Sequence, residues 1–99
     1  MIYIIWEFDV ESSKMSAFEE TYGSHGAWTI LFQQSKNYHG TVLLKDHAKL
    51  GSYITIDQWD NLVDFENFKT QHIEAYNELD YQCENLTLAE KKIGIFDNI

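Results

Sequence analysis

His72 is the residue of this 99-residue chain whose type and position most directly suggest acid–base chemistry. It falls on an apolar stripe with helical spacing, four positions from both Phe68 and Tyr76, where a solvent-facing polar side chain is not expected. An imidazole with an ordinary pKa near ~6.5 can accept a proton from a phenol. The sequence therefore predicts His72 as a catalytic base. The alternative is a histidine at the edge of the core, hydrogen-bonded to a backbone carbonyl or a tyrosine hydroxyl.

Aromatic and polar residues near His72 could form a binding site around it. Alternate residues of a strand share one face, which groups Tyr53 with Asp57 and Trp59, while Tyr76 lies one helical turn from His72. If that strand face meets the helix, the result is an aromatic box with a hydroxyl, an imidazole and a carboxylate. We predict that the substrate-binding residues are Trp28, Tyr53, Asp57, Trp59, Phe68 and Tyr76. The alternatives are packing alone for Trp59 and a solvated charge at the strand end for Asp57.

Metal and cofactor motifs are missing from the sequence. The four histidines are dispersed, without a His-x-His pair or a helical i, i+4 pair, and Cys83 is the only cysteine. Neither a phosphate-binding glycine loop nor a nucleophile elbow is present. We therefore expect no metal and no cofactor, and we expect Cys83 to be inert packing.

The charge balance excludes several classes of partner. Sixteen acidic residues against seven lysines give a net charge of −9, which disfavours nucleic acid and anionic membrane surfaces. No apolar run approaches the ~20 residues of a membrane span. A single cysteine suits a reducing compartment, so we expect a cytoplasmic protein.

Hydrophobic periodicity predicts one α+β domain over residues 1–99. Alternation indicates strands at 2–10, 41–45, 52–59 and 91–97, and Gly51 stands in the turn between the second and third. Helical spacing follows Ser12 or Ser13, recurs over 27–34, and continues from 61 to 84 after an Asp60 or Asn61 cap. We expect this last helix to bend near residues 70–71, because an unbroken helix of ~36 Å overshoots a small sheet. This order predicts a ferredoxin-like four-stranded antiparallel sheet with helices on one face.

The strands are apolar on both sides. Tyr3 and Ile5 lie on the side of the first strand opposite Ile4 and Phe8, and the second strand is similarly two-sided. Helices on one face cannot cover both sides of the sheet, and a chain of this length buries a limited share of its surface. We therefore predict a homodimer in which two sheets pack face to face into an α+β barrel.

With these features the chain resembles the antibiotic biosynthesis monooxygenase-like family of dimeric α+β barrels. The resemblance spans nearly the whole chain and is carried by residues 3–8, Tyr22-Gly23, Trp28, Phe32, residues 38–41, residues 53–60, Phe65, Phe68 and His72. It implies two ferredoxin-like subunits, each with a cavity between sheet and helices. The family includes cofactor-independent oxygenases of polycyclic phenols, haem-degrading enzymes and proteins without a known activity. The first-strand asparagine of those enzymes has no match, because Glu7 and Phe8 stand in that region.

Two functions from different classes follow. The first is a cofactor-independent monooxygenase, or a related small enzyme, in which His72 takes a phenolic proton and the resulting anion activates dioxygen. The second is a ligand-binding or accessory protein that uses the same pocket without turnover. A haem-processing enzyme is a weaker third hypothesis, because it needs a haem ligand and room for a macrocycle.

Overall fold

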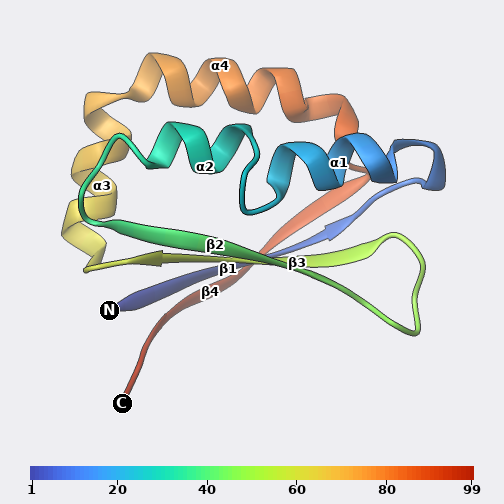
Figure 1. The fold of residues 1–99 in the computed structure, drawn as a ribbon, viewed down its shortest axis with the longest axis horizontal. Helices are drawn as coiled ribbons and strands as arrows, with labels where there is room; N and C mark the ends of the chain where they lie inside the picture. Colours follow the sequence, from blue (N-terminus) through green and yellow to red (C-terminus); the bar gives the residue numbers. More distant parts are fainter.

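A computed structural model describes all residues from 1 to 99 (Figure 1). The elements are, in chain order, β1 (Ile2–Asp9), η1 (Ser12–Lys14), α1 (Met15–Tyr22), α2 (Ala27–Phe32), β2 (Tyr38–Lys45), β3 (Ser52–Trp59), α3 (Leu62–Gln71), α4 (Ile73–Cys83), η2 (Glu84–Leu86) and β4 (Ala89–Asp97). The predicted strands and helices are all present, with ends that shift by up to three residues.

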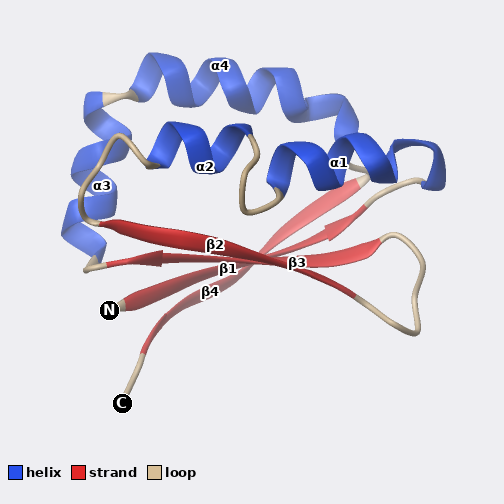
Figure 2. Cartoon of the chain, viewed as in Figure 1, coloured by secondary structure: helices blue, strands red, loops and turns tan.

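The four strands form one antiparallel sheet in the order β2-β3-β1-β4. All four helices lie on the same side of this sheet (Figure 2). The predicted α+β, ferredoxin-like architecture is therefore confirmed. The register pairs Phe8 with Tyr53 and Ile4 with Asp57, which places these side chains on the face that the helices cover.

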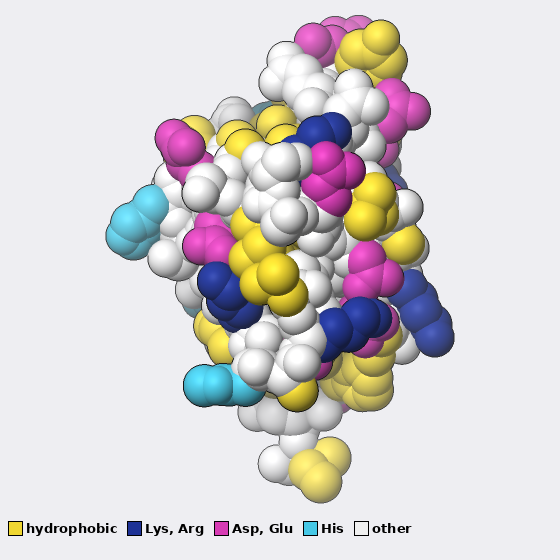
Figure 3. Space-filling model, turned by 90° about the vertical axis from the view of Figure 1, so that its right-hand side faces the viewer, with side chains coloured by type: hydrophobic (Ala, Val, Ile, Leu, Met, Phe, Trp, Pro, Cys, Tyr) yellow, Lys and Arg dark blue, Asp and Glu magenta, His cyan; other side chains and the backbone are white.

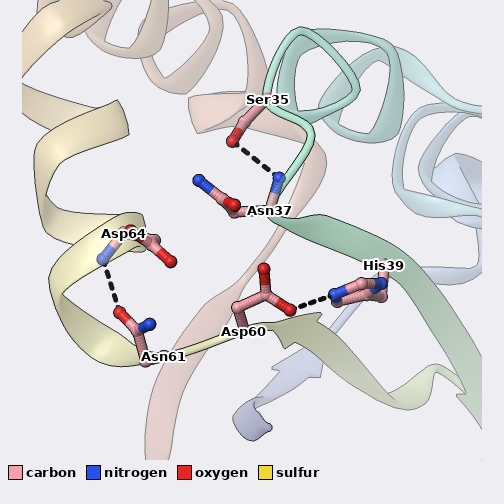
Figure 4. Close-up of polar contacts among 6 residues, drawn as sticks. All are labelled: Ser35, Asn37, His39, Asp60, Asn61 and Asp64. Atoms are coloured by element: carbon pink, nitrogen blue, oxygen red, sulfur yellow. Dashed lines mark hydrogen bonds and ion pairs between the residues drawn. The ribbon is translucent and has the colours of Figure 1, made fainter.

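Local residue chemistry fixes the ends of several elements. The Asn61 side chain caps α3 by accepting the Asp64 backbone N–H at 2.9 Å, and Asp60 instead faces His39 across the strands (Figure 4). In the β2–β3 turn, Gly51 has φ +83°, the left-handed region that favours glycine. A Cβ there would lie 2.2 Å from the Val10 carbonyl oxygen, so the turn requires glycine on two counts.

The predicted bend of the long helix is present. α3 ends at Gln71 and α4 begins at Ile73, and His72 between them has φ −113° and ψ 28°, outside the helical range. α4 then runs back over the sheet beside α2 (Figure 1). The break lets one stretch of chain cover the sheet in two directions.

The hydrophobic core lies between the sheet and the helices, in two groups. One surrounds Trp59, which is fully buried among Phe32, Tyr38 and Phe68. The other surrounds Phe18 and Tyr53, whose rings lie 4.7 Å apart. Eight of the thirteen buried hydrophobic residues are thus aromatic.

The sheet face opposite the helices is uncovered. This open sheet face consists of Tyr3, Ile5, Val42, Leu44, Ile54, Ile56 and Phe96. Val42 is 41% exposed, and Leu44 and Phe96 are each 47% exposed.

Elsewhere the surface is mixed: at the end where α1 and the β2–β3 hairpin lie, acidic, basic and apolar side chains are interspersed (Figure 3). None of the helices has the length and apolar character needed to cross a membrane.

Candidate functional site

A cavity of about 280 Å³ lies between the sheet and the helices. We call it the inner cavity. Every strand and every α-helix contributes to its wall, which consists of Trp6, Phe8, Tyr22, Trp28, Phe32, Thr41, Thr55, Asp57, Lys69, Tyr76, Asn77, Asp80 and Glu90. Its volume is near the lower end of the range for small-molecule sites.

Aromatic rings form the apolar part of the wall. The Trp28 ring meets Tyr76 edge to face, with centroids 5.1 Å apart, and packs against Phe32 at 5.8 Å. Trp6 and Phe8 form the sheet side, with nearly parallel rings 6.4 Å apart. These faces suit a flat apolar or aromatic molecule.

Asp57 is the acid–base group on the sheet side of the inner cavity. Its carboxyl is half-buried, and the Thr41 hydroxyl donates to its Oδ1 at 2.6 Å. Burial raises the pKa of Asp57 to about 6, and the Thr41 hydrogen bond acts in the opposite direction. A carboxyl with this pKa can exchange a proton near neutral pH, as a general base requires.

The wall as a whole carries more negative than positive charge. Asp80 of α4 and Glu90 of β4 lie with Asp57 around the inner cavity, and burial followed by repulsion from Asp80 raises the pKa of Glu90. The one lysine, Lys69, places its Nζ 4.7 Å from the centre of the Tyr76 ring. Burial, with repulsion from Asp80 and other carboxylates, raises the pKa of Tyr76 to about 12.

Three of the predicted substrate-binding residues line the inner cavity together. Trp28, Asp57 and Tyr76 come from α2, β3 and α4 and meet at its wall. Asp57 and Tyr76 meet here because the inner face of β3 lies opposite α4.

The other three predicted substrate-binding residues lie outside the wall, in the core. Trp59 has no exposed surface and Phe68 is 3% exposed. Tyr53 is also buried, and its hydroxyl donates to Glu19 Oε2 at 2.5 Å. Burial and Glu19 together raise the pKa of Tyr53 to about 12. In this structure these three side chains support the site rather than face it.

His72 does not line the inner cavity. It stands at the break between α3 and α4, half-buried, with its ring stacked on Phe68 at a centroid distance of 4.3 Å. Its backbone N–H donates to the Phe68 carbonyl, and its own carbonyl accepts from Tyr76. A catalytic role for His72 stays a prediction from the sequence.

Several wall residues were not singled out in the sequence. Lys69 and Asp80 lie seven and four residues from Tyr76, a helical spacing that could have grouped them with it. Thr41 gave no such signal, because its role depends on the cross-strand register that pairs it with Asp57. No group of three or more His, Cys, Asp or Glu side chains is arranged to hold a metal ion.

Neither a protein-family model nor a curated protein sequence matches the chain. Solved structures do match its fold. SnoaB, a cofactor-independent oxygenase from Streptomyces nogalater, is similar with a TM-score of 0.73 and 18% identity, over 99% of this chain and 92% of that one.

Two further structures extend the comparison. An antibiotic biosynthesis monooxygenase matches with a TM-score of 0.69 and 12% identity, over 100% of this chain and 99% of that one. A conserved protein from Methanosarcina mazei Go1 matches with a TM-score of 0.72 and 8% identity, over 99% and 92% of the two chains. Over nearly its whole length, the chain therefore has the fold of the solved antibiotic biosynthesis monooxygenases.

Proposed function

We propose that this chain is a cofactor-independent monooxygenase that acts on a small phenolic compound in the inner cavity. The observation that carries the proposal is the position of Asp57: a half-buried carboxyl, with a pKa of about 6, that faces a cavity walled by tryptophan, tyrosine and phenylalanine rings. Its likeness in fold to SnoaB supports the same reaction class. In this proposal Asp57, and not His72 as the sequence predicts, is the base.

The proposed chemistry needs only a base and dioxygen. Asp57 takes the phenolic proton: the O–H bond breaks, its electron pair stays on the substrate oxygen, and a new O–H bond forms on the carboxylate. A phenolate that carries further electron-donating groups on its ring is electron-rich enough to reduce dioxygen. In the overall reaction, one oxygen atom replaces the hydrogen of a ring carbon, and the two hydrogens lost by the substrate leave with the second oxygen atom as water. The product is a quinone, formed by a four-electron oxidation.

The size of the inner cavity favours a substrate with one or two rings. At about 280 Å³ it falls near the lower end of the usual range for ligand sites. A haem needs a larger space and an axial ligand, and no histidine lines the wall. The third hypothesis, haem processing, therefore has less support than the other two.

The charge of the wall favours a substrate that is neutral when it binds. Three carboxylates face the space, and the one lysine is engaged with the Tyr76 ring. An anionic ligand would meet repulsion that is only partly screened in a half-enclosed site. A neutral phenol avoids this cost and becomes charged only after transfer of its proton to Asp57.

We propose that the chain works as a homodimer joined through the open sheet face. Val42, Leu44 and Phe96 are between 41% and 47% exposed there, which is unusual for a contiguous apolar surface on a monomer. A second copy offers the same apolar surface, as a two-fold interface requires.

The buried free thiol of Cys83 supports a reducing compartment such as the cytoplasm.

Oxygen uptake tests the proposed function. Protein treated with a chelator is mixed with a panel of one- and two-ring phenols, and dissolved oxygen is followed with an electrode. We expect at least one phenol to drive uptake with formation of a quinone absorbance band. Binding of phenols without any uptake would instead favour the ligand-binding protein.

A further inference from the structure

A row of three hydroxyl groups connects Asp57 to the backbone carbonyl of Gly23. The Thr41 hydroxyl donates to Asp57 Oδ1 at 2.6 Å and makes a very short contact with the Tyr38 hydroxyl. The Tyr38 hydroxyl is also 3.3 Å from the Thr29 hydroxyl, which in turn lies 3.3 Å from the Gly23 carbonyl oxygen. Thr29, Tyr38 and Thr41 are each at most 9% exposed, so these hydroxyls depend on one another for hydrogen bonds.

The number of protons in the row depends on the state of Asp57. With Asp57 ionised, three hydroxyl protons are shared among four contacts. Thr41 donates to Asp57, and Tyr38 donates to Thr41. Thr29 donates either to the Tyr38 hydroxyl or to the Gly23 carbonyl, each at 3.3 Å. With Asp57 protonated, four protons serve the same four contacts, and the donation runs the other way, from Asp57 toward the Gly23 carbonyl. Both states thus keep the two short hydrogen bonds next to Asp57.

We propose that Thr41 and Tyr38 are positioning residues that hold the Asp57 carboxyl at the inner cavity and let it accept and return a proton by reversing the direction of donation along the row. This inference rests on the proposed function for its role in turnover, because Asp57 is the base there. It goes beyond that function by assigning a task to two hydroxyl groups that act on the Asp57 carboxyl and not on the substrate.

The row is the main polar support of Asp57. The charged and titratable groups that face it across the inner cavity are Tyr22 of α1, Lys69 of α3, Tyr76 and Asp80 of α4 and Glu90 of β4. None of them forms a hydrogen bond or an ion pair with Asp57; its hydrogen-bond partner is Thr41. The carboxylate is therefore stabilised by hydroxyl donors and not by a cation, so it keeps the basicity that burial gives it.

The ionised state gains more from the row than the protonated state does. Hydrogen bonds to a charged acceptor are roughly twice as strong as neutral ones, and donation from Tyr38 polarises the Thr41 hydroxyl that faces the carboxylate. The extra contact made in the protonated state is a neutral one at 3.3 Å, near the limit for a hydrogen bond. Removal of either hydroxyl should therefore raise the pH at which Asp57 becomes ionised.

Carbon NMR of the Asp57 carboxyl tests the inference without any substrate. The midpoint of its pH titration is measured in the wild type, Thr41→Val, Tyr38→Phe and the double variant. We expect Thr41→Val to raise the midpoint by about one pH unit or more, the size of a lost hydrogen bond to a charged group. Tyr38→Phe should raise it by less, because Tyr38 acts only through Thr41.

Two variants serve as controls. Thr41→Ser keeps the hydroxyl and should restore the wild-type midpoint. Thr55→Val removes a hydroxyl two residues from Asp57 on the same strand that forms no hydrogen bond with the carboxyl, so the midpoint should stay in place. These two variants show how far a substitution near the site shifts the midpoint when the hydrogen bond to Asp57 is kept.

The double variant decides whether the hydroxyls act as one row. Once Thr41→Val cuts the connection, Tyr38→Phe should add no further shift. An unchanged midpoint in Thr41→Val, or a full Tyr38→Phe shift in its presence, would overturn the inference. If the titrations follow the expectation while no phenol drives oxygen uptake, the proposed function fails and the row remains supported.

Discussion

Thr41 and Asp57 are directly paired across β2 and β3, and the Thr41 hydroxyl donates to the Asp57 carboxyl at 2.6 Å. This pair both positions the Asp57 carboxyl and stabilises its ionised form. The sheet register places the carboxyl at the inner cavity, and the hydroxyl partly offsets the cost of keeping it ionised there. An ionised Asp57 therefore lowers the stability of the fold, which the proposed function explains by its role as a base.

Asp57→Asn should stabilise the protein at neutral pH. The pKa of Asp57 is raised from 3.8 to about 6 in the folded chain, so its contribution to stability is fully present below pH 4 and is lost as the pH rises through 6. An amide has no such penalty, and the free energy of unfolding should increase by about 1–3 kcal/mol at pH 7. Urea denaturation at pH 4 and pH 7 measures this: the gain should shrink at the lower pH. An equal gain at both pH values would argue against a buried, ionised carboxyl.

Acidic residues on the open sheet face should separate the proposed dimer. Val42→Glu combined with Leu44→Glu places two charges where the second copy would pack, and burial of unpaired charge is costly. We expect sedimentation velocity at micromolar concentration to show a dimer for the wild type and a monomer for this variant. Ile30→Glu is the matched control, since Ile30 is 63% exposed on the helix side of the molecule. A wild-type protein that sediments as a monomer would rule out the dimer.

Gly51→Ala should destabilise the β2–β3 hairpin. Both the left-handed φ of +83° and the 2.2 Å approach of the new Cβ to the Val10 carbonyl oppose a side chain. The expected loss is about 1–3 kcal/mol, measured by thermal melting. Gly40→Ala separates the two causes, because Gly40 also has a positive φ, of 125°, but has open space around its Cβ position. Equal losses in the two variants would mean that the close approach to Val10 contributes nothing.

His72→Ala should lower stability and leave turnover nearly unchanged. The ring stacks on buried Phe68 at 4.3 Å and does not line the inner cavity, so its removal costs about 0.5–1.5 kcal/mol of aromatic packing. Chemical denaturation and oxygen uptake are measured on the same preparation. A loss of uptake by about 10²–10⁴-fold with unchanged stability would return the role of base to His72.

The fold could be predicted from the sequence because its signals are local. Period-two alternation located the strands, helical spacing located the helices, and the excess length of residues 61–84 indicated the bend that the structure has at His72. Gly51 was identified as a turn residue by its type alone.

The site was only partly predictable, because it depends on how far each side chain reaches from the core. Asp57 and Trp59 share a strand face, yet Trp59 ends under α3 in the core while Asp57 borders the inner cavity. Periodicity assigns a face but not a position along it. For the same reason the helical spacing placed His72 on the stripe of Phe68 and Tyr76, but it could not show that the His72 ring packs on Phe68 outside the wall of the inner cavity.

The most direct test of the account is the initial rate of oxygen uptake by metal-free Asp57→Asn, with a phenol that the wild type consumes. An asparagine keeps the shape of the side chain and can still accept from Thr41, but it cannot take a proton. We expect a rate about 10²–10⁴-fold below the wild type, while binding of the phenol, followed by tryptophan fluorescence, should be unchanged. Uptake at the wild-type rate would contradict it, since the phenolic proton would then have another acceptor.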